Sequence, residues 1–114
     1  YASFVNDCIE ACGMERISEL SANIDNLDPY SEERDAFATA ILGGSYQLSF
    51  DSDGRVLLPE NLISKARLDN KAVFIGKGKT FEIWNPEIFS TYMQKAQDTA
   101  FANRKLLKFN KNDK

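Results

Sequence analysis

The spacing of hydrophobic residues changes at Gly43 and Gly44, and this change limits the folds open to the chain. Before the glycines, apolar residues recur every three or four positions, as on one face of a helix. After them, Tyr46, Leu48 and Phe50 alternate with polar residues, and the run DSDG separates them from the apolar residues 56–58. A strand-like segment on each side of such a turn predicts a β-hairpin. The sequence therefore predicts an α+β fold.

Two amphipathic helices are expected before the glycines. The first, over residues 13–27, carries its apolar side chains on one face: Met14, Ile17, Leu20, Ile24 and Leu27. Pro29 ends it, because proline disfavours the helical conformation in the residue before it. Ser31 is a favourable N-cap followed by acidic residues, so a second helix is expected to run to about Leu42.

The second half predicts a short helix, a hairpin and a long helix. Pro59 ends the preceding strand, and a helix is expected over residues 60–66. Residues 72–76 and 80–84 form the expected second hairpin. Asn85 as N-cap and Pro86 at the first position open the last helix, which precedes a polar, basic end at residues 110–114.

A repeated strand-and-helix unit is also visible. The segment from Tyr1 to Phe4 and the helix after it are similar to residues 80–84 and the long helix that follows them. We expect residues 1–44 to be the remnant of a first repeat with linker helices. Residues 45–84 are then a second repeat, and residues 85–114 a helix and basic tail. Because the chain starts in a strand and without Met, we expect a fragment of a longer protein.

The residue types argue against metal, redox and catalytic chemistry. The chain has no histidine, so Cys8 and Cys12 lack the further ligands of a zinc site, and a disulfide at their spacing in a helix is strained. We expect free thiols and no cofactor. With no nucleophile-and-base pattern and no phosphate-cradling glycine motif, we do not expect an enzyme. No apolar run is long enough for a membrane span.

The overall charge of −3 conceals a gradient along the chain. Residues 1–50 carry two basic and nine acidic side chains, a net −7. Residues 51–84 carry a net +1 and residues 85–114 a net +3. The acidity therefore belongs to the first half, and a nucleic-acid partner of the second half is compatible with this distribution.

The ordered series FDSDGRVLLPENLI, ARLD, VFIGKG and TFEIWNPE resembles the second repeat of the MraZ family, which has the AbrB-like swapped-hairpin fold. The resemblance covers about residues 45–90 and includes the family's DxxxR motif, Asp51-x-x-x-Arg55. It implies a swapped-hairpin β-barrel unit with flanking amphipathic helices. It also implies a cytoplasmic, nucleoid-associated transcriptional regulator of the division and cell-wall gene cluster. Members bind tandem promoter repeats in double-stranded DNA as ring-like homo-oligomers, and the family's first DxxxR hairpin is absent here.

The expected DNA-binding residues begin with Asp51, Gly54 and Arg55. Asp51 can orient the Arg55 guanidinium while Gly54 supplies the backbone angle of the turn. A fixed arginine can fork onto guanine O6 and N7 or lie along a phosphate. Bracing of the turn is an alternative role for the same pair. The expected phosphate contacts are the neighbouring cations, and for each lysine a solvated surface charge is the alternative: Lys65, Arg67, Lys71, Lys77 and Lys79.

An oligomer interface is expected at Phe74, Phe81, Ile83 and Trp84, with burial in the barrel core as the alternative. Because one unit cannot close the barrel alone, we expect a dimer or larger oligomer formed between the 45–84 segments. An alternative function is an AbrB-like antitoxin-type module, in which the helices of residues 13–42 or the C-terminal helix grip a partner protein.

Overall fold

The computed structural model describes residues 1–107 and confirms the α+β class. The elements are β1 (Ala2–Val5), β2 (Cys8–Cys12), α1 (Met14–Asp25), α2 (Glu32–Phe37), the π-helix η1 (Ala38–Leu42), α3 (Glu60–Lys65), β3 (Val73–Lys77), β4 (Thr80–Trp84), α4 (Pro86–Ala102) and the 3₁₀ turn η2 (Arg104–Leu106). Among these residues, no helix has both the length and the hydropathy of a membrane span. The basic end predicted at residues 110–114 lies outside the described part of the chain.

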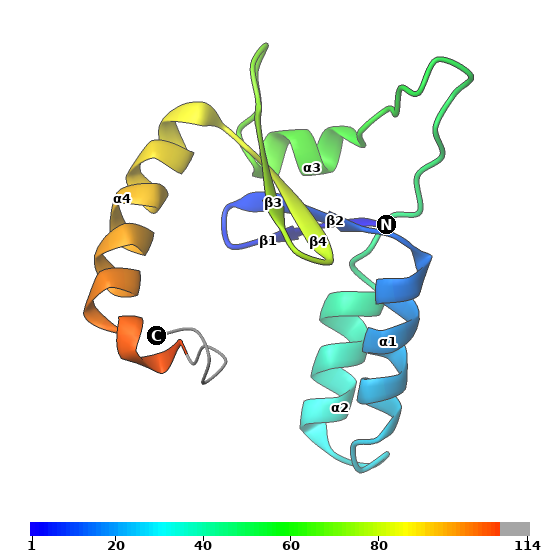
Figure 1. The fold of residues 1–114 in the computed structure, drawn as a ribbon. Coiled ribbons are helices and arrows are strands. Elements are labelled where there is room, and N and C mark those ends of the chain that lie inside the picture. Colours follow the sequence, from blue (N-terminus) through cyan, green and yellow to red (C-terminus); the bar gives the residue numbers. More distant parts are fainter. Residues whose placement is uncertain (108–114) are drawn as a thin grey trace, which may run out of the picture.

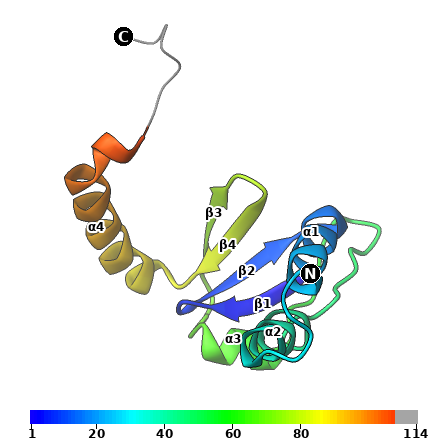
Figure 2. The ribbon, with the colours of Figure 1, turned by 90° about the horizontal axis from the view of Figure 1, so that it is seen from below.

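Two hairpins build one antiparallel sheet in the order β1-β2-β4-β3. The inner strands β2 and β4 pair with each other, with Ile9 opposite Ile83 and Glu10 opposite Glu82. Each inner strand leads directly into a helix, α1 after β2 and α4 after β4. Figure 2 shows that these two helices leave opposite ends of the sheet.

The internal repeat is present, but the predicted alignment is wrong. The segment that corresponds to β4 is β2, and the first residues form β1, which corresponds to β3. The turn between β1 and β2 has positive φ at Asn6 (50°) and Asp7 (69°), the backbone of a two-residue hairpin turn. The first unit therefore contains a complete hairpin, and Cys8 and Cys12 lie in a strand instead of the helix considered for them.

The prediction of a β-hairpin around DSDG is also wrong, because the segments on either side of this turn do not form strands. Within residues 1–107, the segment 46–58 forms a single bridge, between Tyr46 and Ala2, with hydrogen bonds of 2.8 and 2.9 Å. Phe50 and Leu57 stay exposed, while Leu48 and Leu58 pack partly against the core. The two flanks of the turn thus share no complete packed face. A two-stranded hairpin on its own is marginal in water, which explains why only its turn forms.

The core lies between the sheet and α3. Leu62 and Ala66 of this short helical segment pack with Ala2, Ile9 and Ile83, and all five are buried. The partly buried Leu48 and Leu58 cover the edge of this cluster, so the long loop is attached to the core at both of its ends. The predicted helix over residues 60–66 is confirmed.

The two helices before the loop form a separate pair. The Ser31 side chain accepts the Arg34 N–H at 3.1 Å, as expected of an N-cap. Arg34 also pairs with Asp25 of α1 at 3.0 Å. Figure 1 shows α1 and α2 packed side by side at one end of the sheet, while α4 runs away from the other end. The molecule thus has two helical arms on either side of a small sheet.

Candidate nucleic-acid interface

The Asp51 side chain builds the turn of the long loop. Its Oδ1 accepts the backbone N–H groups of Asp53 and Arg55, both at 2.9 Å, and the Arg55 carbonyl accepts the Asp51 N–H at 2.8 Å. Gly54 has φ +77°, a conformation that side chains disfavour, and donates to the Asp51 carbonyl at 3.1 Å. The N–H of Arg55, more than any other group, holds the pKa of the Asp51 carboxyl below its usual range.

Two carboxylates hold the Arg55 guanidinium. Its Nε donates to Asp51 Oδ2 and its Nη2 donates to Asp53 Oδ2, each at 3.1 Å. A guanidinium has five N–H groups, so three remain for another partner. The side chain is 74% exposed. The motif therefore presents an oriented, accessible fork of donors.

The position of the loop adds to this accessibility. Residues 43–59 connect η1 to α3 as a long loop that extends away from the sheet (Figure 1). The charge at its end is not basic, because Asp51 and Asp53 outnumber Arg55. This balance favours a neutral, acceptor-rich base edge over a phosphate as the partner of the guanidinium.

The other predicted cations do not gather in one patch. Lys65 lies beside Tyr46 and Asn61 in one hollow, and Arg67 lies with Asp69 and Lys71 in another. The Arg67 backbone has φ 56°, and its carbonyl accepts the side-chain N–H of Asn85 at 2.7 Å. Lys65 and Arg67 are exposed at the end of α3 and just after it.

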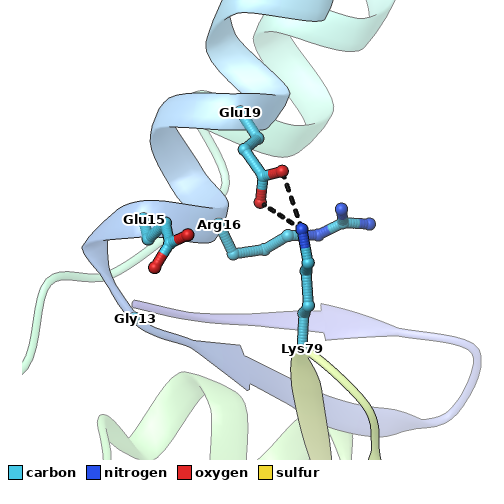
Figure 3. Close-up of a pocket in the computed structure, with 5 residues that line it drawn as sticks. All are labelled: Gly13, Glu15, Arg16, Glu19 and Lys79. Carbon is cyan, nitrogen blue, oxygen red and sulfur yellow. Dashed lines mark hydrogen bonds and ion pairs between the residues drawn. The ribbon is translucent and has the colours of Figure 1, made fainter.

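Lys77 and Lys79 are held by carboxylates of the same chain. Lys79 pairs with Glu19 of α1 at 2.9 Å, and Figure 3 shows its ammonium beside the Arg16 side chain in a hollow of about 240 Å³. Lys77 pairs with Glu82 at 3.0 Å, which raises its pKa. Either lysine would have to share or exchange its carboxylate in order to contact a phosphate.

The four predicted interface residues divide into two kinds. Trp84 and Ile83 are buried inside the chain, at 1% and 5% exposure. Phe74 and Phe81 are exposed and stack on each other with ring centroids 6.4 Å apart. Only the second pair is accessible to another molecule.

Sequence reasoning missed two carboxylates. Asp53 accepts the second hydrogen bond of the Arg55 guanidinium. The sequence signal for this role is that Asp53 lies inside the Asp51-x-x-x-Arg55 motif. Glu82 is buried, accepts the Trp84 indole N–H at 2.8 Å and pairs with Lys77. The signal for Glu82 is that its diagonal neighbour across the predicted hairpin is a lysine.

The cysteines carry no site. Both are free thiols, as predicted, and burial is the main cause that raises the pKa of Cys8 to about 12, which makes it a poor nucleophile. Among the described residues, no group of three or more His, Cys, Asp or Glu side chains could hold a metal ion.

The described part of the chain combines a small antiparallel sheet with a long loop whose turn exposes an oriented arginine. A family model described as "MraZ protein, putative antitoxin-like" matches residues 41–109, which include this turn. The chain is 52% identical over 108 residues to "Transcriptional regulator MraZ" of Rickettsia canadensis (strain McKiel), covering 95% of this chain and 72% of that protein. The same-named protein of Rickettsia akari (strain Hartford) is 52% identical over 104 residues, covering 91% and 70%. The chain belongs to the MraZ family.

Proposed function

We propose that this chain is a transcriptional regulator that binds double-stranded DNA through the loop Asp51-x-x-x-Arg55. The observation that carries the proposal is the Arg55 guanidinium, which is oriented by two carboxylates and open to solvent. The names of the relatives support regulation of transcription as the general role. The proposal places the protein in the cytoplasm, on the nucleoid.

The finer proposal is that Arg55 forks onto O6 and N7 of a guanine in the major groove. Lys65 and Arg67, which are free of the ion pairs that hold Lys77 and Lys79, are then the first candidates for phosphate contacts. The targets are tandem promoter repeats upstream of the division and cell-wall gene cluster. A ring-like homo-oligomer presents several loops together, so that weak single contacts add through effective concentration.

Fluorescence anisotropy with a duplex from the upstream region of the chain's own operon tests this function. Arg55→Ala is expected to weaken binding about fivefold or more, because a bidentate arginine-guanine pair is worth about 1–3 kcal/mol. Arg34→Ala is the matched control, since it removes the same charge from α2, outside the loop. Equal affinity of wild type and Arg55→Ala would refute the role of the loop.

A second candidate is an antitoxin-type interaction module. The description of the matching family and the two helical arms support it. Capture of a defined basic partner protein with an affinity unchanged in Arg55→Ala, together with no DNA binding by wild type, would favour this candidate.

A further inference from the structure

Two cations from distant parts of the chain line one hollow of about 240 Å³. Arg16 lies in the first turn of α1, and Lys79 lies in the turn between β3 and β4. Lys79 donates to both carboxylate oxygens of Glu19, at 2.9 and 3.2 Å. Figure 3 shows the Arg16 side chain passing beside the Lys79 ammonium without a bond to this carboxylate. The two cations are thus brought together, and the carboxylate is bonded to the lysine.

Arg16 has no acceptor of its own within residues 1–107. Its Nε is buried without a hydrogen-bond partner there, and the ion pairs of this part of the chain do not include it. Arg34, the other basic residue of the first fifty, is paired with Asp25. A buried N–H without an acceptor costs free energy, and such a group is commonly satisfied by an ion, a ligand or water. The Arg16 guanidinium therefore points to an anionic acceptor from outside the chain.

A phosphate has the chemistry that this hollow requires. Its oxygens accept charge-assisted hydrogen bonds from arginine and lysine together. The Lys79–Glu19 pair is exposed, with 63% and 38% of the two side chains accessible, so it contributes little and the ammonium can turn to a phosphate at small cost. Gly13, the N-cap of α1, lines the same hollow without a side-chain cap, so the free N–H groups of the first turn also favour an anion there.

The hollow lies at the foot of the Arg55 turn. Gly13 also lines a neighbouring hollow of about 200 Å³, together with Phe50 and Val56. Phe50 directly precedes Asp51 of the motif, and Val56 directly follows Arg55. Every base of a duplex is flanked by backbone phosphates, so DNA that touches the turn also brings phosphates towards the start of α1.

We propose that the hollow of Arg16 and Lys79 binds a backbone phosphate of the DNA that Arg55 contacts. The inference rests on the proposed function and deepens it, because it adds a DNA contact from the acidic first half of the chain. Phosphate contacts fix the position of a protein on the duplex without reading its sequence. Arg16 thus positions the turn, and Arg55 reads the base.

Fluorescence anisotropy across a series of salt concentrations tests the phosphate contact, on the target duplex and on a duplex of scrambled sequence. Arg16→Gln removes the charge, and Arg16→Lys keeps it. Arg34→Gln is the matched control, because it removes the same charge from α2. Circular dichroism checks that each variant is folded.

For Arg16→Gln we expect the slope of log affinity against log salt concentration to fall in magnitude by about 0.9, the value of one phosphate contact. Affinity is expected to fall about threefold or more, and by the same factor on both duplexes, because a phosphate contact carries no sequence information. Arg16→Lys and Arg34→Gln are expected to keep the slope of wild type.

A gain of affinity provides a second readout that loss of folding cannot imitate. Glu19→Gln frees Lys79 and removes a negative charge beside the bound phosphate, so we expect binding to tighten about threefold or more. Glu33→Gln, which removes the same charge from an exposed position of α2, is the control, with a smaller expected gain.

Two results would overturn the proposal: a folded Arg16→Gln with the salt slope of wild type, or a Glu19→Gln that binds no more tightly than Glu33→Gln. A free anion or an acidic partner protein as the true occupant of the hollow would give the first result. The reading of a base by Arg55 fails separately, because Arg55→Ala would then discriminate between the two duplexes as well as wild type does. A wild type that binds neither duplex would refute both proposals.

Discussion

At the scale of single residues, Asp51 has two tasks that a substitution can separate. One oxygen holds the turn through two backbone N–H groups, and the other holds Arg55 Nε. Asp51→Asn keeps one acceptor oxygen for the backbone but loses the second, so the turn stays while the guanidinium is released.

For Asp51→Asn we expect DNA affinity to fall about threefold to tenfold, because an arginine that is free to rotate forks onto a base less often. Simple electrostatics predicts the opposite sign, since a negative charge is removed near DNA. Anisotropy measurements with Asp69→Asn as the charge-matched control decide between the two effects. An affinity equal to or above that of wild type would show that orientation by Asp51 is unimportant.

The depressed pKa of Asp51 gives the loop a defined pH dependence. A carboxyl whose pKa is lower in the folded state stabilises it above its ordinary pKa of 3.8, and this contribution is lost as the pH falls through the lowered value. We expect the amide shifts of Asp53 and Arg55 in an NMR titration to change with a midpoint below 3.8. A midpoint at or above that value would contradict the hydrogen bonds described for the turn.

At the scale of the elements, capping and turn residues correctly predicted the helices and strands whose packing partners are close in the sequence. Ser31 and Asn85 cap the helices where expected, and β3 and β4 pair as predicted. Residues 46–50 alternate regularly, yet the segment 46–58 forms no strands, because strand formation depends on a neighbouring strand that the pattern does not contain. The β1–β2 hairpin was missed because Asn6 and Asp7 make its turn without a glycine.

The anchor of α4 is also an element-scale feature. Trp84 is buried, stacks on Tyr92 with centroids 4.7 Å apart and donates to Glu82. We expect Trp84→Ala to lower the free energy of unfolding by about 3–5 kcal/mol, through the lost burial and the cavity. Phe74→Ala, at a residue that is 67% exposed, is the matched aromatic control, with an expected change below about 1 kcal/mol. Urea unfolding of both variants measures this difference, and equal losses would contradict the assignment of Trp84 to the core.

At the scale of the whole molecule, the sequence predicted a gradient of charge but not its arrangement in space. The acidic helices α1 and α2 lie on one side of the sheet, and Arg104 and Lys105, which follow α4, belong to the arm on the other side. The predicted cations are also dispersed. Lys79 pairs with Glu19 of α1, 60 positions away in the sequence, and Lys77 pairs with Glu82, five positions away. Composition alone does not reveal either ion pair. Of the predicted DNA-binding set, the motif Asp51, Gly54 and Arg55 is a local unit, and for that reason its geometry was predictable.

The most direct test of the account is a double-mutant cycle, in which one change removes the Arg55 guanidinium and the other removes the guanine N7 that it is proposed to contact. Each guanine of the repeat is replaced in turn by 7-deazaguanine, which lacks N7, and affinity is measured by anisotropy for wild type and Arg55→Ala. The account predicts one guanine whose replacement weakens wild type by about fivefold or more but leaves the affinity of Arg55→Ala unchanged. If every replacement weakens both proteins equally, Arg55 does not read a guanine N7 and the central claim is wrong.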